Sequence, residues 1–194
     1  DRKALVAPVE RAMKAGIPVA IYDSALDTDQ QITYVATDNK EGGRMAARRL
    51  AEVIGKKGKV AVIGFMAGSA STMEREDGFV EEIKKYPDIK MLGIQFGMAN
   101  HAKAMAVTVK LVAFDASQQL IDDLKAGWID ALIVQDPFKM GYEATKAVAM
   151  KLRGQQPVKQ MDSGSKLVTL ADMEKPEIRE LLFPNIRQYL DEGH

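Results

Sequence analysis

Apolar runs that end abruptly in a carboxylate or an amide are the feature that most constrains this chain. Three runs share it: LVAF stands before Asp115, IPVAIY before Asp23 and ALIV before Gln135. Short uncharged runs bounded by polar residues are typical of buried parallel strands. The carboxyl ends of such strands meet in one crevice, which is where open α/β sheets bind their ligands. We therefore expect Asp23, Asp115 and Gln135 to lie around one site.

The rest of the sequence alternates strand-like and helix-like segments, which indicates an α/β fold built on mainly parallel sheets. Apolar runs predict strands at 17–23, 32–39, 59–65, 90–96, 109–115 and 129–135. Residues 59–65 carry no charge after the first lysine, so we expect that strand to be buried on both faces. Helical periodicity predicts helices at 5–16, 40–58, 118–128 and 139–154, one after the small-residue loop that begins at Met66, and one beginning in 99–108. The last 30 residues predict a short strand and helical segments interrupted by Pro176 and Pro184.

Composition excludes several function classes. The 194 residues include 27 basic and 27 acidic ones, so no net charge attracts nucleic acid or an anionic membrane. Cysteine is absent, which excludes thiol catalysis, disulfides and cysteine-based zinc sites. The two histidines, His101 and His194, have no nucleophile or carboxylate at a telling spacing. We therefore expect no enzyme activity, no catalytic residue, no metal site and no cofactor.

Each strand-end residue also has a structural alternative, which is to cap the helix that follows. For Asp115, which precedes the helix 118–128, capping and ligand contact are equally good interpretations. No helix follows Asp23 at once, so capping does not explain it. Next to Gln135, Asp136 is the better cap because Pro137 takes the favoured first helical position. These residues accept and donate hydrogen bonds in the way that a neutral, hydroxyl-rich ligand requires.

A fourth candidate is Arg75, at the start of the helix that follows the small-residue loop in GFMAGSASTMERE. The loop lacks the Lys-Ser/Thr ending of a phosphate-binding loop. A cation near a helix N-terminus opposes the helix dipole, so Arg75 suggests another use. Its guanidinium can form paired hydrogen bonds to neighbouring hydroxyl groups. A salt bridge to Glu74 or Asp77 is the equally good structural alternative.

Five segments together resemble one family, the type I periplasmic sugar-binding proteins of ABC transporters, near their ribose-binding branch. The segments are AMKAGIPVAIYDS, YVATDNKEGGRMAARRLAE, GKVAVIGFMAGSASTMEREDGF, VKLVAFDAS and ALIVQDPFKMGYEATKAV. The resemblance implies two Rossmann-like lobes with parallel sheets, joined by three hinge crossings and closing on a sugar. It implies ligand contacts at Asp23, Arg75, Asp115 and Gln135. Ser24 stands where the ribose branch has an arginine, which points away from ribose itself.

The resemblance also implies a division of the chain, with crossings near 37–38, 135–136 and 162–163. Residues 1–37 and 136–194 are expected to form the first lobe, and residues 38–135 the second. Between Thr108 and Val109 a helix runs into a strand with no turn residue, and the family pattern lacks a βα unit there. We therefore expect the chain to be an incomplete form of a longer protein.

The expected ligand is a monosaccharide or polyol, and the expected partner is an ABC transporter permease. The expected location is the periplasm, outside the cytoplasm, although the chain itself contains no signal peptide, and we expect a monomer with no nucleic acid partner. The alternative is the sugar-responsive effector domain of a LacI-type transcription regulator, which shares the fold. Aromatic rings beside strand ends can stack on sugar rings, although core packing is their more common use. The aromatic candidates are Tyr22, Phe65, Phe114 and Phe138.

Overall fold

The computed structural model describes residues 2–64, 68–96 and 110–186. The helices are α1 (Val6–Lys14), α2 (Asn39–Val53), α3 (Ala70–Ile83), α4 (Gln118–Lys125), α5 (Pro137–Leu152), the short 3₁₀ helix η2 (Leu170–Asp172) and α6 (Pro176–Leu182). The strands are β1 (Ala20–Tyr22), β2 (Thr33–Ala36), β3 (Gly58–Gly64), β4 (Ile89–Phe96), β5 (Val112–Phe114), β6 (Ala131–Gln135), β7 (Gln160–Asp162) and β8 (Ser165–Val168).

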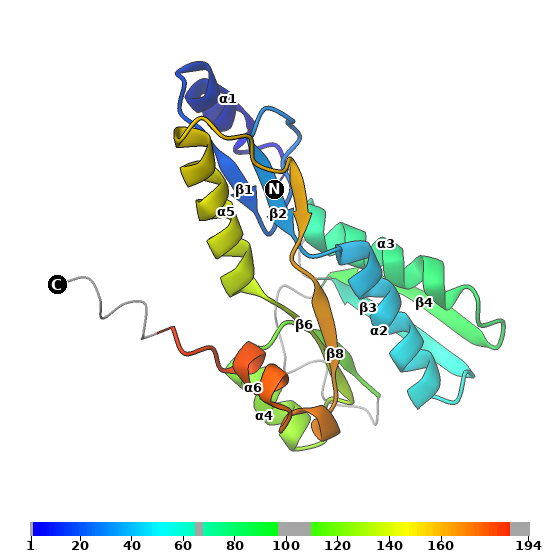
Figure 1. The fold of residues 1–194 in the computed structure, drawn as a ribbon. Coiled ribbons are helices and arrows are strands. Elements are labelled where there is room, and N and C mark those ends of the chain that lie inside the picture. The colour runs from blue at the N-terminus through cyan, green and yellow to red at the C-terminus, as the bar shows by residue number, and fades with distance from the viewer. Residues whose placement is uncertain (1, 65–67, 97–109, 187–194) are drawn as a thin grey trace.

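A small unit consists of α1, α5 and a sheet in the order β1–β2–β7, whose strands are all parallel (Figure 1). Helix α5 packs against β1 and β2. The core of this unit is formed by Val35 from β2 with Met140 and Ala144 from α5. The small unit therefore buries one face of its sheet beneath a single long helix.

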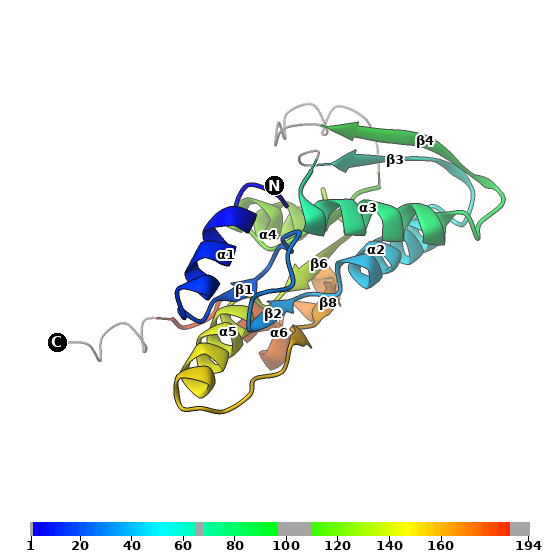
Figure 2. The ribbon, with the colours of Figure 1, turned by 90° about the horizontal axis from the view of Figure 1, so that it is seen from above.

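A large unit contains the remaining elements and has two sheets. In the first, β3 and β4 pair in parallel and are covered on one face by α2 and α3 (Figure 2). In the second, of order β5–β6–β8, β6 pairs in parallel with β5 and antiparallel with β8. Helices α4 and α6 pack on this sheet around Leu124, Leu132 and Ile178. Helix α2 connects the two sheets of the large unit, since it contacts α3, which covers the first sheet, as well as β5 and β6 of the second.

The chain passes between the small and large units three times: from β2 to α2, from β6 to α5, and from β7 to β8 (Figure 1). The third passage corrects the predicted division, because residues 165–182 do not belong with residues 1–37. Strand β8 pairs with β6, and Val168 packs in the same core as Leu124. The C-terminal segment therefore returns to the large unit after contributing β7 to the small one.

The structure contains each predicted strand and helix that falls on described residues, mostly with shorter bounds, although β3 and β4 each begin one residue earlier than predicted. Strand β7 was missed, because its sequence QMD shows no apolar alternation. The prediction that β3 is buried on both faces is wrong, since Ala61 and Ile63 on its second face are exposed. The helix expected to begin in 99–108 and the predicted break between Thr108 and Val109 lie outside the described residues. No helix in the described part of the chain has the length and apolarity needed to cross a membrane.

Candidate functional site

Strands β1 and β5 end in the same local structure, although they belong to different units. Asp23 follows β1 with φ 68°, and its backbone N–H donates to the Val35 carbonyl at 2.9 Å. Asp115 follows β5 with φ 75°, and its N–H donates to the Ile133 carbonyl at 2.8 Å. Aspartate tolerates this left-handed conformation better than most residues. The chain therefore bends sharply at the end of each strand and leaves the aspartate there exposed.

Asp115 is the centre of a polar group in the large unit. The side-chain amide of Gln135 donates from Nε2 to Asp115 Oδ1 at 2.5 Å. Arg75 Nη1 lies 3.8 Å from Asp115 Oδ2. The other amide atom, Gln135 Oε1, is buried and accepts no hydrogen bond from the described residues. Three of the four predicted ligand residues thus lie together, as their positions at strand ends and on α3 predicted.

The guanidinium of Arg75 is held on two further sides. It lies over the ring of Phe114, with Cζ 3.7 Å from the ring centroid, which is a cation–π contact. Its Nε donates to Asn39 Oδ1 at 2.8 Å. Burial lowers the pKa of Arg75, and the negative charges of Asp115, Asp23 and Glu74 oppose that shift. The guanidinium remains charged throughout the physiological range.

Asp23 brings the small unit into the same electrostatic site, since its charge acts on both Arg75 and Tyr34. The Tyr34 hydroxyl donates to the backbone carbonyl of Asp23 at 3.4 Å. Burial, with the nearby charges of Glu74 and Asp23, raises the pKa of Tyr34 to about 12. The phenol therefore stays protonated and remains a hydrogen-bond donor at neutral pH.

The structural alternatives can now be separated. Ser117, not Asp115, caps α4, because its Oγ accepts from the backbone N–H of Leu120 at 3.3 Å. Asp136 caps α5 as predicted, accepting from the Lys139 N–H at 2.8 Å, with Pro137 beginning the helix. The predicted position of Arg75 at a helix start is wrong, since α3 begins at Ala70. Arg75 therefore lies in the second turn, and no conflict with the helix dipole explains it.

The predicted aromatic residues take different roles. Phe114 supports Arg75 on one ring face. Phe138 stacks with Tyr142 on α5, with ring centroids 6.4 Å apart, on the small unit. Tyr22 is exposed at the end of β1, and Phe65 lies outside the described residues. Stacking of any of these rings on a sugar remains a prediction.

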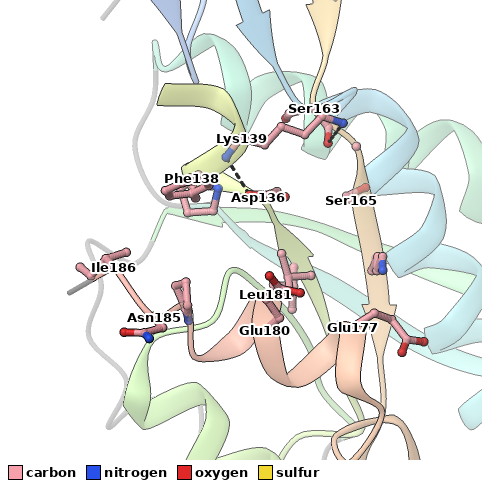
Figure 3. A pocket seen from close by; sticks show the side chains of 15 residues that line it. Asp136, Phe138, Lys139, Ser163, Ser165, Glu177, Glu180, Leu181, Asn185 and Ile186 are labelled. Carbon is pink, nitrogen blue, oxygen red and sulfur yellow. Dashed lines mark hydrogen bonds between the residues drawn. The ribbon is translucent and has the colours of Figure 1, made fainter. Parts of the chain in front are cut away.

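Two cavities lie beside the crossings. One cavity has a volume of about 450 Å³ and is lined by the start of α5, the crossing 163–165 and α6. Figure 3 shows Lys139 and Phe138 on one side of this cavity and Glu180 on the other. The second, of about 400 Å³, is lined by Tyr34, Asn39 and Glu74 among others. The second cavity therefore adjoins the residues around Arg75, and the first is lined by the aromatic candidate Phe138 but by none of Asp23, Arg75, Asp115 and Gln135.

Sequence reasoning missed Asn39 and Tyr34, and it named Glu74 only as a possible salt-bridge partner of Arg75. The spacing of Asn39 from Arg75 gives no local signal, because the two side chains meet only through the packing of α2 on α3. Among the described residues no cluster of His, Asp or Glu has the geometry to hold a metal ion.

Comparison with known proteins shows the family and the fold of the chain. The sequence profile of the periplasmic binding protein domain matches residues 1–108, more than half of the chain. The chain belongs to the periplasmic binding protein family. A solved ABC transporter solute-binding protein from Agrobacterium vitis, bound with α-D-tagatopyranose, is 30% identical with a TM-score of 0.86, covering 94% of this chain and 76% of that one. The predicted type I periplasmic binding protein fold is thereby confirmed.

Two further relatives of this family member are binding proteins and not enzymes. A ribose import binding protein of Bacillus subtilis is 26% identical over 201 residues, which cover 87% of this chain and 66% of the relative. The D-allose-binding periplasmic protein of Escherichia coli is 33% identical over 116 residues, which cover 56% of this chain and 37% of the relative. The chain thus spans less than two thirds of the length of either curated relative.

Proposed function

We propose that this family member binds a neutral monosaccharide or polyol between its small and large units and delivers it to an ABC-type membrane permease outside the cytoplasm. The observation that carries the proposal is the grouping of Asp115, Gln135 and Arg75 on the large unit, within electrostatic reach of Asp23 on the small one. Relatives with import or periplasmic binding in their names favour transport over the regulator alternative.

The charges around Arg75 support an uncharged ligand. The negative charges of three carboxylates, those of Asp115, Asp23 and Glu74, act on this one cation. A sugar phosphate or sugar acid would add a further negative charge to this group and be repelled. Hydroxyl groups can instead accept from the guanidinium and donate to the carboxylates.

Binding by both units would also explain how the ligand drives closure. A ligand shifts a hinge equilibrium only by the free energy of contacts that it makes in one state and not in the other. A sugar that bridges Asp23 and Asp115 gains both sets of contacts only when the units are close together. The two units are, on this proposal, the two lobes of the hinged trap.

A thermal-shift screen over pentoses, hexoses and polyols, with sugar phosphates as a negative set, tests the function. We expect neutral sugars or polyols alone to raise the melting temperature. Calorimetry with the best ligand should then show Arg75→Ala binding about tenfold to a hundredfold more weakly, since hydrogen bonds to a charged group contribute roughly 1.5–3 kcal/mol. Arg179→Ala is the matched control, because Arg179 is an exposed arginine of α6. Equal affinity of the two variants, or no stabilising sugar, would contradict the proposal.

A further inference from the structure

We propose that Asn39 is a positioning residue of this site, which fixes the guanidinium of Arg75 and ties it to the chain crossings. The inference deepens the proposed sugar-binding function and rests on it for the expected change in affinity. Its structural part, the restraint of Arg75 by Asn39, can be tested without any ligand.

Asn39 uses both ends of its side-chain amide. It is the first residue of α2 and is 1% exposed. Its Oδ1 accepts from Arg75 Nε at 2.8 Å, and its Nδ2 donates to the Thr37 carbonyl at 3.1 Å. An Nε–H bond lies in the plane of the guanidinium and points away from the ligand-binding fork. A partner at that edge restricts rotation of the plane without occupying the fork.

The other sides of the guanidinium are fixed by the same region of the fold. Phe114 lies 3.7 Å below its Cζ, and the ring in turn rests against Gly42, one turn after Asn39. A Cβ at Gly42 would lie 2.9 Å from the Phe114 ring, so a larger residue would displace it. The first turn of α2 therefore contacts the guanidinium of Arg75 at one edge through Asn39, and it supports the ring of Phe114 that covers one face. The remaining edge faces Asp115, with Nη1 at 3.8 Å.

Asn39 also connects Arg75 with the crossings. Thr37, whose carbonyl Asn39 binds, donates from Oγ1 to the Gly164 carbonyl at 3.1 Å. The neighbouring Asp38 N–H donates to Asp162 Oδ1 at 3.0 Å. The first and third crossings are thus bonded to each other, and Asn39 links them to the ligand-facing arginine. Since Asp115 bonds Gln135 at the second crossing, the polar residues form one continuous chain through all three.

A purely structural role for Asn39 would be to satisfy the Thr37 carbonyl at the start of α2. Two substitutions separate this role from positioning. Asn39→Leu has nearly the same shape and loses both hydrogen bonds. Asn39→Asp keeps an acceptor for Arg75 Nε but places an oxygen against the Thr37 carbonyl, so it damages only the structural bond.

The ligand-free test is solvent exchange of the Arg75 Nε–H proton, followed by ¹⁵N NMR on the full chain. We expect slow exchange in the wild-type protein and in Asn39→Asp, and exchange at least tenfold faster in Asn39→Leu. If Asn39→Leu does not fold, Asn39→Ser replaces it, because the serine hydroxyl is too short to reach Nε. Fast exchange in the wild-type protein, or equal exchange in all variants, would overturn the proposal.

The affinity test is a double-mutant cycle by calorimetry. Asn39→Leu should weaken sugar binding about tenfold in the wild-type background and less than twofold in the Arg75→Ala background, because the effect acts through Arg75. An equal loss in both backgrounds would show a structural role and refute positioning. If no sugar binds the wild-type protein while Asn39→Leu alone loses proton protection, the sugar-binding function fails and the positioning role stands.

Discussion

The ends of β1 and β5 have the same backbone and differ in what holds their aspartates. Pairing of Tyr22 with Val35 and of Phe114 with Ile133 places the two strand ends in equivalent register with the next strand. Asp115 bonds Gln135 and lies beside Arg75, whereas no side chain in the described ranges hydrogen-bonds the carboxylate of Asp23. One half of the site is therefore assembled in advance, and the other half consists of a carboxylate that is left available.

The equivalence between β2 and β6 continues into the crossings that follow them, where the two units differ in their hydrogen bonds. Thr37 and Gln135 occupy equivalent positions, followed by the capping residues Asp38 and Asp136, which each accept from a backbone N–H at 2.8 Å. Thr37 bonds the third crossing, whereas Gln135 bonds Asp115 at the end of β5. The same arrangement of strand, crossing and helix thus bonds two crossings together at Thr37, whereas at Gln135 we propose that it serves ligand binding.

The largest expected difference between the halves concerns Gly43 and Gly141, at equivalent positions in α2 and α5. A Cβ at Gly43 would lie 2.0 Å from the Arg75 carbonyl oxygen, whereas at Gly141 nothing lies within 4 Å. Gly43→Ala should lower the free energy of unfolding by about 3 kcal/mol, as overpacking does. Gly141→Ala should raise it by up to about 1 kcal/mol through helix propensity. Urea denaturation of both variants measures the contrast, and equal effects would contradict the close packing of α2 on α3.

The next contrast is between Asp115→Asn and Asp23→Asn, since asparagine keeps the left-handed backbone that alanine would strain. Each substitution should weaken sugar binding by about 1.5–3 kcal/mol, because each removes charge-assisted bonds to hydroxyl groups. The Asp115 variant should lose more, since it also removes the carboxylate nearest Arg75. Calorimetry on the two variants decides this, with Asp122→Asn on α4 as the control. An unchanged affinity in either folded variant would remove that aspartate from the site.

At the crossings, Gln135→Ala and Thr37→Val should have opposite consequences. Gln135→Ala should weaken sugar binding while leaving the melting temperature of the ligand-free protein nearly unchanged. Thr37→Val removes the bond to the Gly164 carbonyl and should lower the free energy of unfolding by about 1 kcal/mol. Calorimetry measures the sugar affinity of each variant, and thermal unfolding measures the stability of each. A large loss of stability in Gln135→Ala would show that Gln135 is structural.

The smallest contrast is at Tyr34, whose equivalent in the large unit is the fully buried Leu132. Because the folded-state pKa of Tyr34 is raised to about 12, its contribution is complete below the unfolded-state value of about 10 and is lost as the pH rises from 10 toward 12. Tyr34→Phe should therefore lose less stability than wild type between pH 9 and 11, by about 1 kcal/mol or less after solvent screening. Urea denaturation of both proteins across this pH range measures the difference, and equal losses would contradict the raised pKa of Tyr34.

The sequence predicted the features that depend on short stretches of chain. The strand ends at Asp23, Asp115 and Gln135 and the cap at Asp136 are each visible in a few neighbouring residues. An apolar run that ends in a carboxylate predicts where that carboxylate lies, because the carboxyl end of a parallel strand faces the crevice.

What the sequence did not predict depends on contacts between distant segments. The role of Asn39 arises from the packing of α2 on α3, and the placement of residues 165–182 arises from the pairing of β8 with β6. The chain from β7 to β8 changes sheets at Gly164, with φ 85°, and nothing in the local pattern tells which sheet each strand joins. Local periodicity fixes the type of an element but not its neighbours.

The central claim is that both aspartates contact one small ligand. A crystal structure with the sugar that most raises the melting temperature tests it most directly. We expect the sugar between the carboxylates of Asp23 and Asp115, with hydroxyl groups within hydrogen-bond distance of both and of Arg75. A sugar that touches only one unit, or that occupies the cavity between Lys139 and Glu180 instead, would contradict the account.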